Sequence, residues 1–273
     1  MPYKYAPHWT ALMVIITIAG FWPSYFVPIT KVPLAFHVHA FTAMAWLFLI
    51  IAQSIAIQRR KNALHKTLGK ASFVLFPLVI FGMFMILNNM AQRYANAPTE
   101  VDLVTGPGFS FMMMIATAAF LVLFYYSLKH RRNVRLHAGY LLATPLILFE
   151  SSFGRLQDRI FPWLNVIDSE WPHAFMDSIP INNTMATVFA LVLYFMDRKN
   201  GAPWLVVSGF LTAHSLMWFA PYFAFPAKTL QLYALIPPNL GLMVGLLAGI
   251  AVTYFGWKAG SPPERRDAQA VHA

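Results

Sequence analysis

The chain has 273 residues, of which 58% are hydrophobic and 11% are charged, and it contains no cysteine. A soluble domain carries about a quarter charged residues, so this composition offers too little polar surface for a water-exposed globule. The lack of cysteine excludes disulfides, thiolate metal sites, cysteine-held iron–sulfur clusters and cysteine nucleophiles. The formal net charge is +10, but Lys and Arg fall in short connections between apolar runs. That pattern indicates orientation in a bilayer and no binding to nucleic acid.

Apolar runs of about 20 residues recur along the chain and predict an all-α, polytopic membrane helical bundle. We expect one transmembrane domain over residues 1–260 and a disordered cytoplasmic tail over 261–273. The seventh span is broken near its end by Pro221 and Pro226. About eight spans are predicted, near residues 8–28, 35–57, 70–90, 107–128, 134–154, 181–196, 203–225 and 236–257.

The Lys and Arg residues predict which side of the membrane each connection occupies. Most of them fall on one side of the predicted bundle, which is therefore cytoplasmic, with both termini inside. This pattern is typical of a multi-pass protein of the bacterial inner (plasma) membrane. The long connection 154–180 then lies outside, and its aromatic residues predict either a lid or an anchor at the headgroup level. The cytoplasmic set is Lys4, Arg59, Arg60, Lys61, Lys66, Lys70, Lys129, Arg131, Arg132, Arg135, Arg198, Lys199, Lys258, Arg265 and Arg266.

One short pattern occurs twice. Arg59-Arg60-x-x-x-Leu64-His65 recurs as Arg131-Arg132-x-x-x-Leu136-His137, each time at the cytoplasmic start of a span. Either the third and fifth helices are related by an axis along the membrane normal, or both converged on a good inner-face boundary. His65 and His137 match in depth, so they are candidate ligands of haem b. The alternative is helix capping or contact with lipid phosphate.

Polar residues inside the spans concentrate in the outer halves, which predicts a polar cavity that opens to the outside. An ionisable residue within a span is costly and is by default a functional hypothesis. Glu150 is therefore the leading candidate for a catalytic base or a metal ligand, the alternative being that it reaches the interface beside Arg155. Arg155 and four amides are predicted to orient a substrate: Asn88, Asn89, Asn182 and Asn183.

Three histidines accompany Glu150. His214 lies near the middle of the seventh span and is predicted to be a catalytic residue, a ligand or a proton carrier. His37 and His39 begin the second span, and residues two apart on a helix point about 200° apart, so we expect only one of them to face a ligand. Together, His37, His39, His214 and Glu150 are the candidate ligands for zinc or non-haem iron, with haem b as the alternative cofactor.

The last span carries a stripe of small residues, Gly241, Gly245 and Gly249. A glycine at every fourth position lets helices approach closely, either within the bundle or in a homodimer.

The stretch over residues 37–69 combines an outer His, Trp46, Gln53, a basic pair and Leu64-His65-x-x-Leu68-Gly69. It resembles a pattern in bacterial polytopic membrane proteins and, more distantly, the cytochrome b561 and haem A synthase types of helical bundle. The chain departs from those haem families in lacking clear pairs of span-buried histidines at equal depth. The resemblance implies redox or haem-related work and assigns no ligand.

The sequence therefore favours an inner-membrane enzyme, redox or metal-dependent, that acts on a lipophilic small molecule among the membrane lipids. The outward-facing His/Glu/Asn pocket would carry the reaction. The alternatives are a proton-coupled transporter or small-ligand receptor that uses the same pocket, and a structural membrane subunit whose polar groups only join helices.

Overall fold

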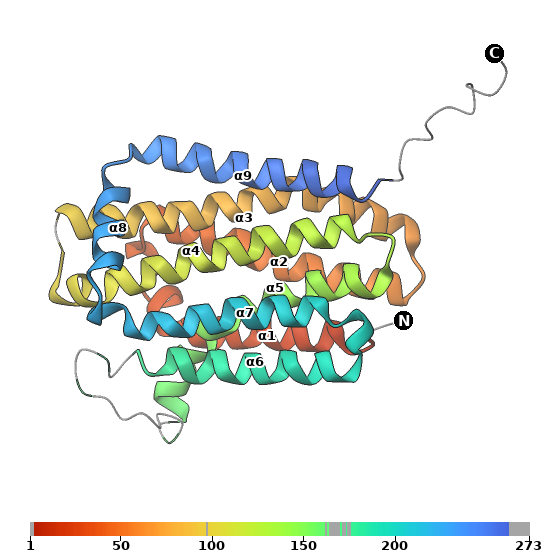
Figure 1. Ribbon diagram of the computed structural model, residues 1–273, viewed down its shortest axis with the longest axis horizontal. Helices are drawn as coiled ribbons and strands as arrows, with labels where there is room; N and C mark the ends of the chain where they lie inside the picture. The colour runs from red at the N-terminus through yellow and green to blue at the C-terminus, as the bar shows by residue number, and fades with distance from the viewer. Residues whose placement is uncertain are drawn as a thin grey trace, which may run out of the picture.

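The computed structural model describes residues 3–96, 98–161, 163, 170, 173 and 176–261. Within that part of the chain there are helices and no strands, and the long helices run side by side (Figure 1). The α-helices are α1 (Ala6–Phe21), α2 (Leu34–Gln58), α3 (Asn62–Asn96), α4 (Glu100–Lys129), α5 (Val134–Ile160), α6 (Ser178–Met196), α7 (Ala202–Ser215), α8 (Ala224–Ala234) and α9 (Pro238–Ala259). Shorter π or 3₁₀ segments are η1 (Trp22–Phe26), η2 (Ile29–Lys31), η4 (Arg198–Asn200) and η5 (Leu216–Tyr222).

By length and composition, the helices are typical of a multi-pass membrane protein. In the described residues, 7 segments are long and apolar enough to cross a membrane. The expected span 134–154 lies within α5, which is long enough but carries more polar residues and is not one of these segments. The seven are Ala6–Phe26, Leu34–Gln58, Asn62–Asn96, Glu100–Lys129, Ser178–Met196, Ala202–Tyr222 and Pro238–Ala259.

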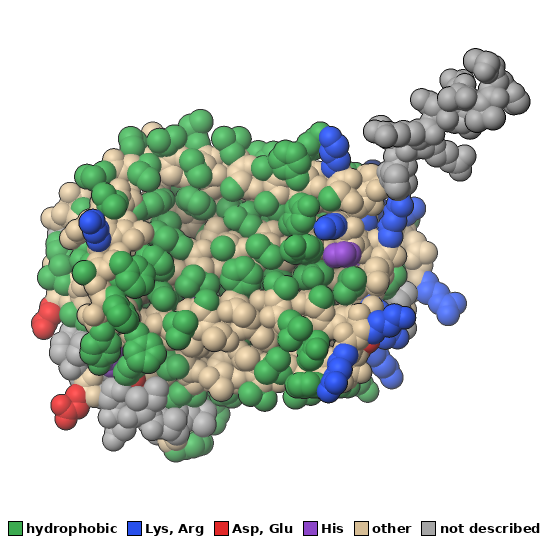
Figure 2. Space-filling view, in the orientation of Figure 1, with side chains coloured by type: hydrophobic (Ala, Val, Ile, Leu, Met, Phe, Trp, Pro, Cys, Tyr) green, Lys and Arg blue, Asp and Glu red, His purple; other side chains and the backbone are tan. Residues whose placement is uncertain are grey.

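The charged side chains divide the bundle into two unlike ends. Figure 2 shows most Lys and Arg side chains at the end where α9 finishes and the N-terminus lies, with hydrophobic side chains across the middle. We call this the basic end. It is formed where α2 and α4 finish and α3 and α5 start, and its cations include Arg59, Arg60, Lys61, Lys66, Lys70, Lys129, Arg131 and Arg132. We call the other end of the bundle the opposite end.

Two helix boundaries differ from the apolar pattern. Helix α3 begins at Asn62, well before the predicted start at residue 70, because Leu, Lys and Ala are good helix formers that extend the helix beyond its apolar part. His65 and Lys66 are consequently helical. The predicted break in the seventh span is present: α7 ends at Ser215, and η5 follows with Pro221 inside it.

Aromatic packing joins the central helices. Trp46 on α2 is buried, and its indole N–H donates to Thr144 Oγ1 on α5 at 2.9 Å. Its ring lies against Phe76 of α3 and Phe124 of α4, whose own ring centres are 3.9 Å apart. A tryptophan N–H buried in an apolar bundle needs such a partner. Trp46 therefore joins α2, α3, α4 and α5 about midway along α2.

The glycine stripe of α9 packs within the same chain. Gly241, Gly245 and Gly249 are buried against Asn88, Phe84 and Pro77 of α3 respectively. This close approach of two helices is what a small-residue stripe permits. Homodimerisation through the same glycines stays a prediction.

A matched pair of glycine substitutions tests this packing. A Cβ at Gly249 would lie 2.6 Å from Cα of Pro77, whereas nothing lies within 4 Å of a Cβ at Gly209 in α7. Gly249→Ala should lower the free energy of unfolding in detergent by about 1–3 kcal/mol, because backbone must move. Gly209→Ala should leave it unchanged or raise it by up to about 1 kcal/mol, since alanine is the better helix former. Equal effects of the two substitutions would contradict the packing.

Candidate functional site

A cavity of about 590 Å³ lies at the basic end between α2, α3, α4 and α5. Its volume is within the range of small-molecule and cofactor sites. Most of its wall is apolar, and its polar lining comes from Gln53, His65, His137 and the nearby cations. The full lining is Trp46, Leu49, Ile50, Gln53, Ser54, Ile57, His65, Lys66, Gly69, Lys70, Ser72, Phe73, Phe124, Ser127, Leu128, Arg131, Arg132, Val134, His137, Ala138, Leu141, Leu142 and Trp257.

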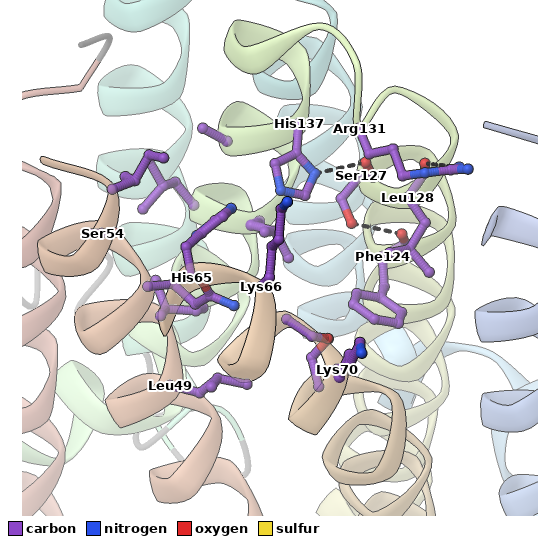
Figure 3. A pocket seen from close by; sticks show the side chains of 18 of the residues that line it. Leu49, Ser54, His65, Lys66, Lys70, Phe124, Ser127, Leu128, Arg131 and His137 are labelled. Carbon is purple, nitrogen blue, oxygen red and sulfur yellow. Dashed lines mark hydrogen bonds between the residues drawn. The ribbon is translucent and has the colours of Figure 1, made fainter. Parts of the chain in front are cut away.

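The repeated sequence pattern brings its two histidines together in this cavity. His65 is the fourth residue of α3 and His137 the fourth residue of α5, and both helices start at the basic end. The two imidazole ring centres are 6.5 Å apart and their planes are nearly perpendicular, at 88°. Figure 3 shows both side chains among the residues that line the cavity.

The orientation of His137 is fixed by its neighbours. Asn133 caps α5, its side-chain oxygen accepting the N–H of Leu136 at 3.2 Å. One turn into the helix, Nδ1 of His137 lies 2.8 Å from the Ser127 carbonyl oxygen of α4 (Figure 3). A carbonyl only accepts, so Nδ1 carries the proton and Nε2 keeps a free lone pair. Metal-bound histidines are held in this way.

His65 is held by Gln53 of α2. The Gln53 amide satisfies both of its neighbours when its oxygen accepts the Gly69 N–H, at 2.7 Å, and its nitrogen faces Nδ1 of His65. In this orientation Nδ1 of His65 accepts a hydrogen bond and Nε2 carries the proton. The two cavity histidines thus have opposite tautomers. Rotation of the Gln53 amide would move the proton of His65 from Nε2 to Nδ1.

Cations surround the mouth of the cavity. Arg131 is held in place: its guanidinium stacks on Trp257 at 3.9 Å and donates to the Trp257 carbonyl oxygen at 2.6 Å. Burial, with the charge of Arg132 beside it, lowers the pKa of Arg131 from its ordinary value. Among the described residues, Arg93–Asp102 and Arg135–Asp197 form ion pairs, and neither pair involves a cation of this mouth. No carboxylate of the described chain therefore neutralises Lys66, Lys70, Arg131 or Arg132, which favours an anionic group at this mouth.

At the opposite end, the structure brings some predicted residues together. The Asn183 amide nitrogen on α6 is 3.3 Å from His214 Nδ1, and Nε2 of His214 is 3.1 Å from the Met112 carbonyl oxygen of α4. Glu150 is buried on α5, and Asn182 is buried next to Asn183. Gly154, one turn after Glu150, lies against Asn182. A Cβ added at Gly154 would be 3.2 Å from the amide nitrogen of Asn182.

The remaining predicted residues make other contacts. His37 pairs with Tyr25, its Nδ1 lying 2.9 Å from the phenol oxygen. The Nδ1 atom of His39 and the Oδ1 atom of Asn89 are buried without a hydrogen-bond partner among the described residues. Asn88 joins α3 to α8 and α9: it accepts from the Tyr233 hydroxyl at 2.6 Å and donates to the Pro238 carbonyl oxygen at 2.9 Å.

Arg155 makes local contacts at the end of α5. Its guanidinium lies over the Phe21 ring at 4.2 Å and donates to the Ser151 carbonyl oxygen.

The metal prediction and the lid prediction stay predictions. In the described part of the chain, no group of three or more His, Asp or Glu side chains is placed to hold a metal ion. The expected lid over 154–180 lies largely outside the described residues. His173, which is described, stacks on Trp218 of η5 with ring centres 4.5 Å apart. The tail from residue 262 onward also lies outside the described residues.

Comparison with known proteins gives no relative: no family model, no curated protein and no solved structure matches the chain.

Several residues that line this cavity carry little functional signal in the sequence. Lys66 and Lys70 belong to the set that predicts orientation in the bilayer, and Gln53 belongs to the stretch over residues 37–69 that carries the family resemblance. The signal that could have found them is the repeated motif, because it places two histidines at matching positions at the starts of two parallel helices. The position of polar residues within the spans, taken alone, predicts a functional site at the opposite end.

An ion pair next to the site makes a pH-dependent contribution to stability. Arg135 bonds Asp197 at 2.5 Å and thereby ties α5 to the end of α6. This hydrogen bond, with that from Asn200, lowers the pKa of the Asp197 carboxyl below its ordinary 3.8. The pair is therefore fully stabilising above pH 3.8, and its contribution is lost as pH falls from there through the lowered pKa. Asp197→Asn should flatten the pH dependence of unfolding in that window, measured by denaturation in detergent.

The control for that measurement is Glu100→Gln, an exposed acid at the opposite end. It should retain the wild-type slope. A slope unchanged in Asp197→Asn would show that the ion pair does not stabilise the folded chain.

Proposed function

We propose that this protein is a membrane redox protein that holds haem b between His65 and His137 at the basic end. The observation that carries the proposal is the 6.5 Å separation of the two ring centres inside a cavity. A metal–imidazole bond is about 2 Å long and an imidazole nitrogen lies about 1.1 Å from its ring centre. Two imidazoles that bind one iron from opposite sides would therefore have centres about 6.2 Å apart.

The cavity wall fits the rest of the group. A porphyrin is a flat apolar body with two propionate groups. Trp46, Phe124 and Leu141 supply apolar wall, and Lys66 and Arg132 supply positive charge without a carboxylate partner among the described residues. Bound haem supplies one-electron chemistry whose potential depends on its ligands and their hydrogen bonds.

The two histidines need different help from the protein. Nδ1 of His137 already donates to the Ser127 carbonyl oxygen, which leaves Nε2 free to ligate. For His65 to ligate through Nε2, its proton must lie on Nδ1. Gln53 would then turn its amide so that the oxygen accepts this proton, and would give up its hydrogen bond from the Gly69 N–H. Gln53 is therefore the residue that sets which nitrogen of His65 is available.

The proposal also assigns the topology. The basic end faces the cytoplasm by the positive-inside rule, with both termini inside and α5 as an eighth span in a bacterial inner membrane. The sequence placed the reactive pocket at the outward end. We place it at the basic end, because that is where the described residues line a cavity with two facing histidines.

Spectroscopy of the purified protein tests the proposal. Expressed in a haem-replete host, or titrated with haem, the wild-type protein should show the Soret and visible bands of a six-coordinate, low-spin haem. His65→Ala and His137→Ala should each lose that spectrum and weaken haem binding about tenfold or more. Ala138→Trp, which fills the cavity and keeps both ligands, should reduce the amount bound.

His130→Ala is the matched control. His130 lies at the same end but stacks on Tyr126 and Tyr140 and does not line the cavity. It should bind haem like the wild type. A wild-type protein that takes up no haem, or a His130→Ala variant that loses the spectrum as His65→Ala does, would contradict the proposal.

A further inference from the structure

The seam between α5 and α6 at the opposite end is unusually polar for the interior of a membrane bundle. On α5, Glu150, Gly154 and Gln157 recur at helical spacing and share one face. On α6, Ser178 and Asn182 share a face, and both contact α5 at Gly154, where an added Cβ would be 3.1 Å and 3.2 Å from their side chains. Such groups inside a membrane protein are expensive and mark function.

Two amides of this seam are buried without complete pairing. Asn182 and Asn183 are both 0% exposed. Neither the nitrogen nor the oxygen of the Asn182 amide has a partner among the described residues, and nor does the oxygen of Asn183. The nitrogen of Asn183 is occupied by His214. An unpaired buried polar group costs about 1–3 kcal/mol, so these atoms indicate a ligand that the seam is built to receive.

The pattern of donors and acceptors selects the ligand. A cation would be held by the two amide oxygens but would leave the Asn182 nitrogen, a donor, unpaired. A water molecule both donates and accepts, so it can satisfy the nitrogen and both oxygens, and buried water makes about three such bonds. The other ionisable residues near the seam include Arg155 on α5, the buried Asp177 at the start of α6 and His214 on α7. Asp177 accepts from the Trp218 indole N–H, and His214 is engaged on both nitrogens.

We propose that the α5–α6 seam binds a chain of water molecules that connects the opposite-end surface with the Glu150 carboxyl. Gly154 lets the Ser178 and Asn182 side chains lie close against α5, since a larger residue would displace both. Glu150, one turn deeper on the same face of α5, thereby becomes a group that can exchange protons with that compartment. This inference does not depend on the haem proposal, which concerns the other end of the bundle.

The chain has no cysteine, so single cysteines report local hydration without background. A thiol next to water ionises and binds Ag⁺ with release of its proton, whereas a thiol in apolar surroundings stays protonated and inert. The protein is reconstituted in lipid nanodiscs, treated with Ag⁺, and the remaining thiol is counted after denaturation. Ser178→Cys, Asn182→Cys and Glu150→Cys should each react at least about tenfold faster than the controls.

Two residues of α6 serve as those controls. Val188 is on the outer surface of α6, which faces lipid, and Ala190 is buried nearer the basic end. Val188→Cys and Ala190→Cys should both stay unreactive. Ser178→Cys gives the same test one turn nearer the surface if Asn182→Cys fails to fold.

Three results would overturn the proposal. If the seam variants react as slowly as Val188→Cys, the seam is dry. If Asn182→Cys reacts and Glu150→Cys does not, water stops short of the carboxyl and no proton path reaches it. Fast reaction of Ala190→Cys would mean that Ag⁺ enters the whole bundle without using this seam.

Discussion

The structure depends on one constraint: lipid cannot hydrogen-bond a peptide group or solvate a charge. The chain meets it with long helices that satisfy their own backbone and place the cations at their ends (Figures 1 and 2). Because α3 and α5 both start at the basic end, the first turn of each lies in the same layer. That shared layer brings His65 and His137 close together, with Lys66 and Arg132 lining the same cavity.

Much of the fold could be predicted from the sequence, because burial in lipid demands long apolar runs. The membrane class, most helix positions and the break before Pro221 follow from hydropathy and proline chemistry. The early start of α3 and the short helix α8 could not be predicted this way. Both are decided by helix propensity and packing outside the apolar core, where hydropathy gives no signal. The eighth span stays a prediction, since α5 mixes apolar residues with Glu150 and Arg155.

The candidate site was harder to predict than the fold. Their positions within predicted spans single out Glu150 and His214, because an ionisable group inside a span costs free energy whichever way it points. A cavity, in contrast, forms where side chains from different helices leave a space unfilled. A pattern along the sequence does not show where this happens. The repeated Arg-Arg-x-x-x-Leu-His motif contained the necessary clue, yet a matching boundary position alone does not distinguish a ligand pair from two independent caps. The structure separates the polar residues into a histidine cavity at one end and an amide-lined seam at the other.

The central claim is that His65 and His137 face each other across the basic-end cavity, and cysteine cross-linking tests it most directly. In this cysteine-free chain, the double variant His65→Cys/His137→Cys should be joined by a short bifunctional thiol reagent. The pair His65→Cys/His130→Cys should not, because His130 packs on Tyr126 and Tyr140 outside the cavity. Efficient cross-linking of the first pair alone is the result that we predict. Equal cross-linking of both pairs, or none of the first, would contradict the arrangement of α3 and α5 on which the account rests.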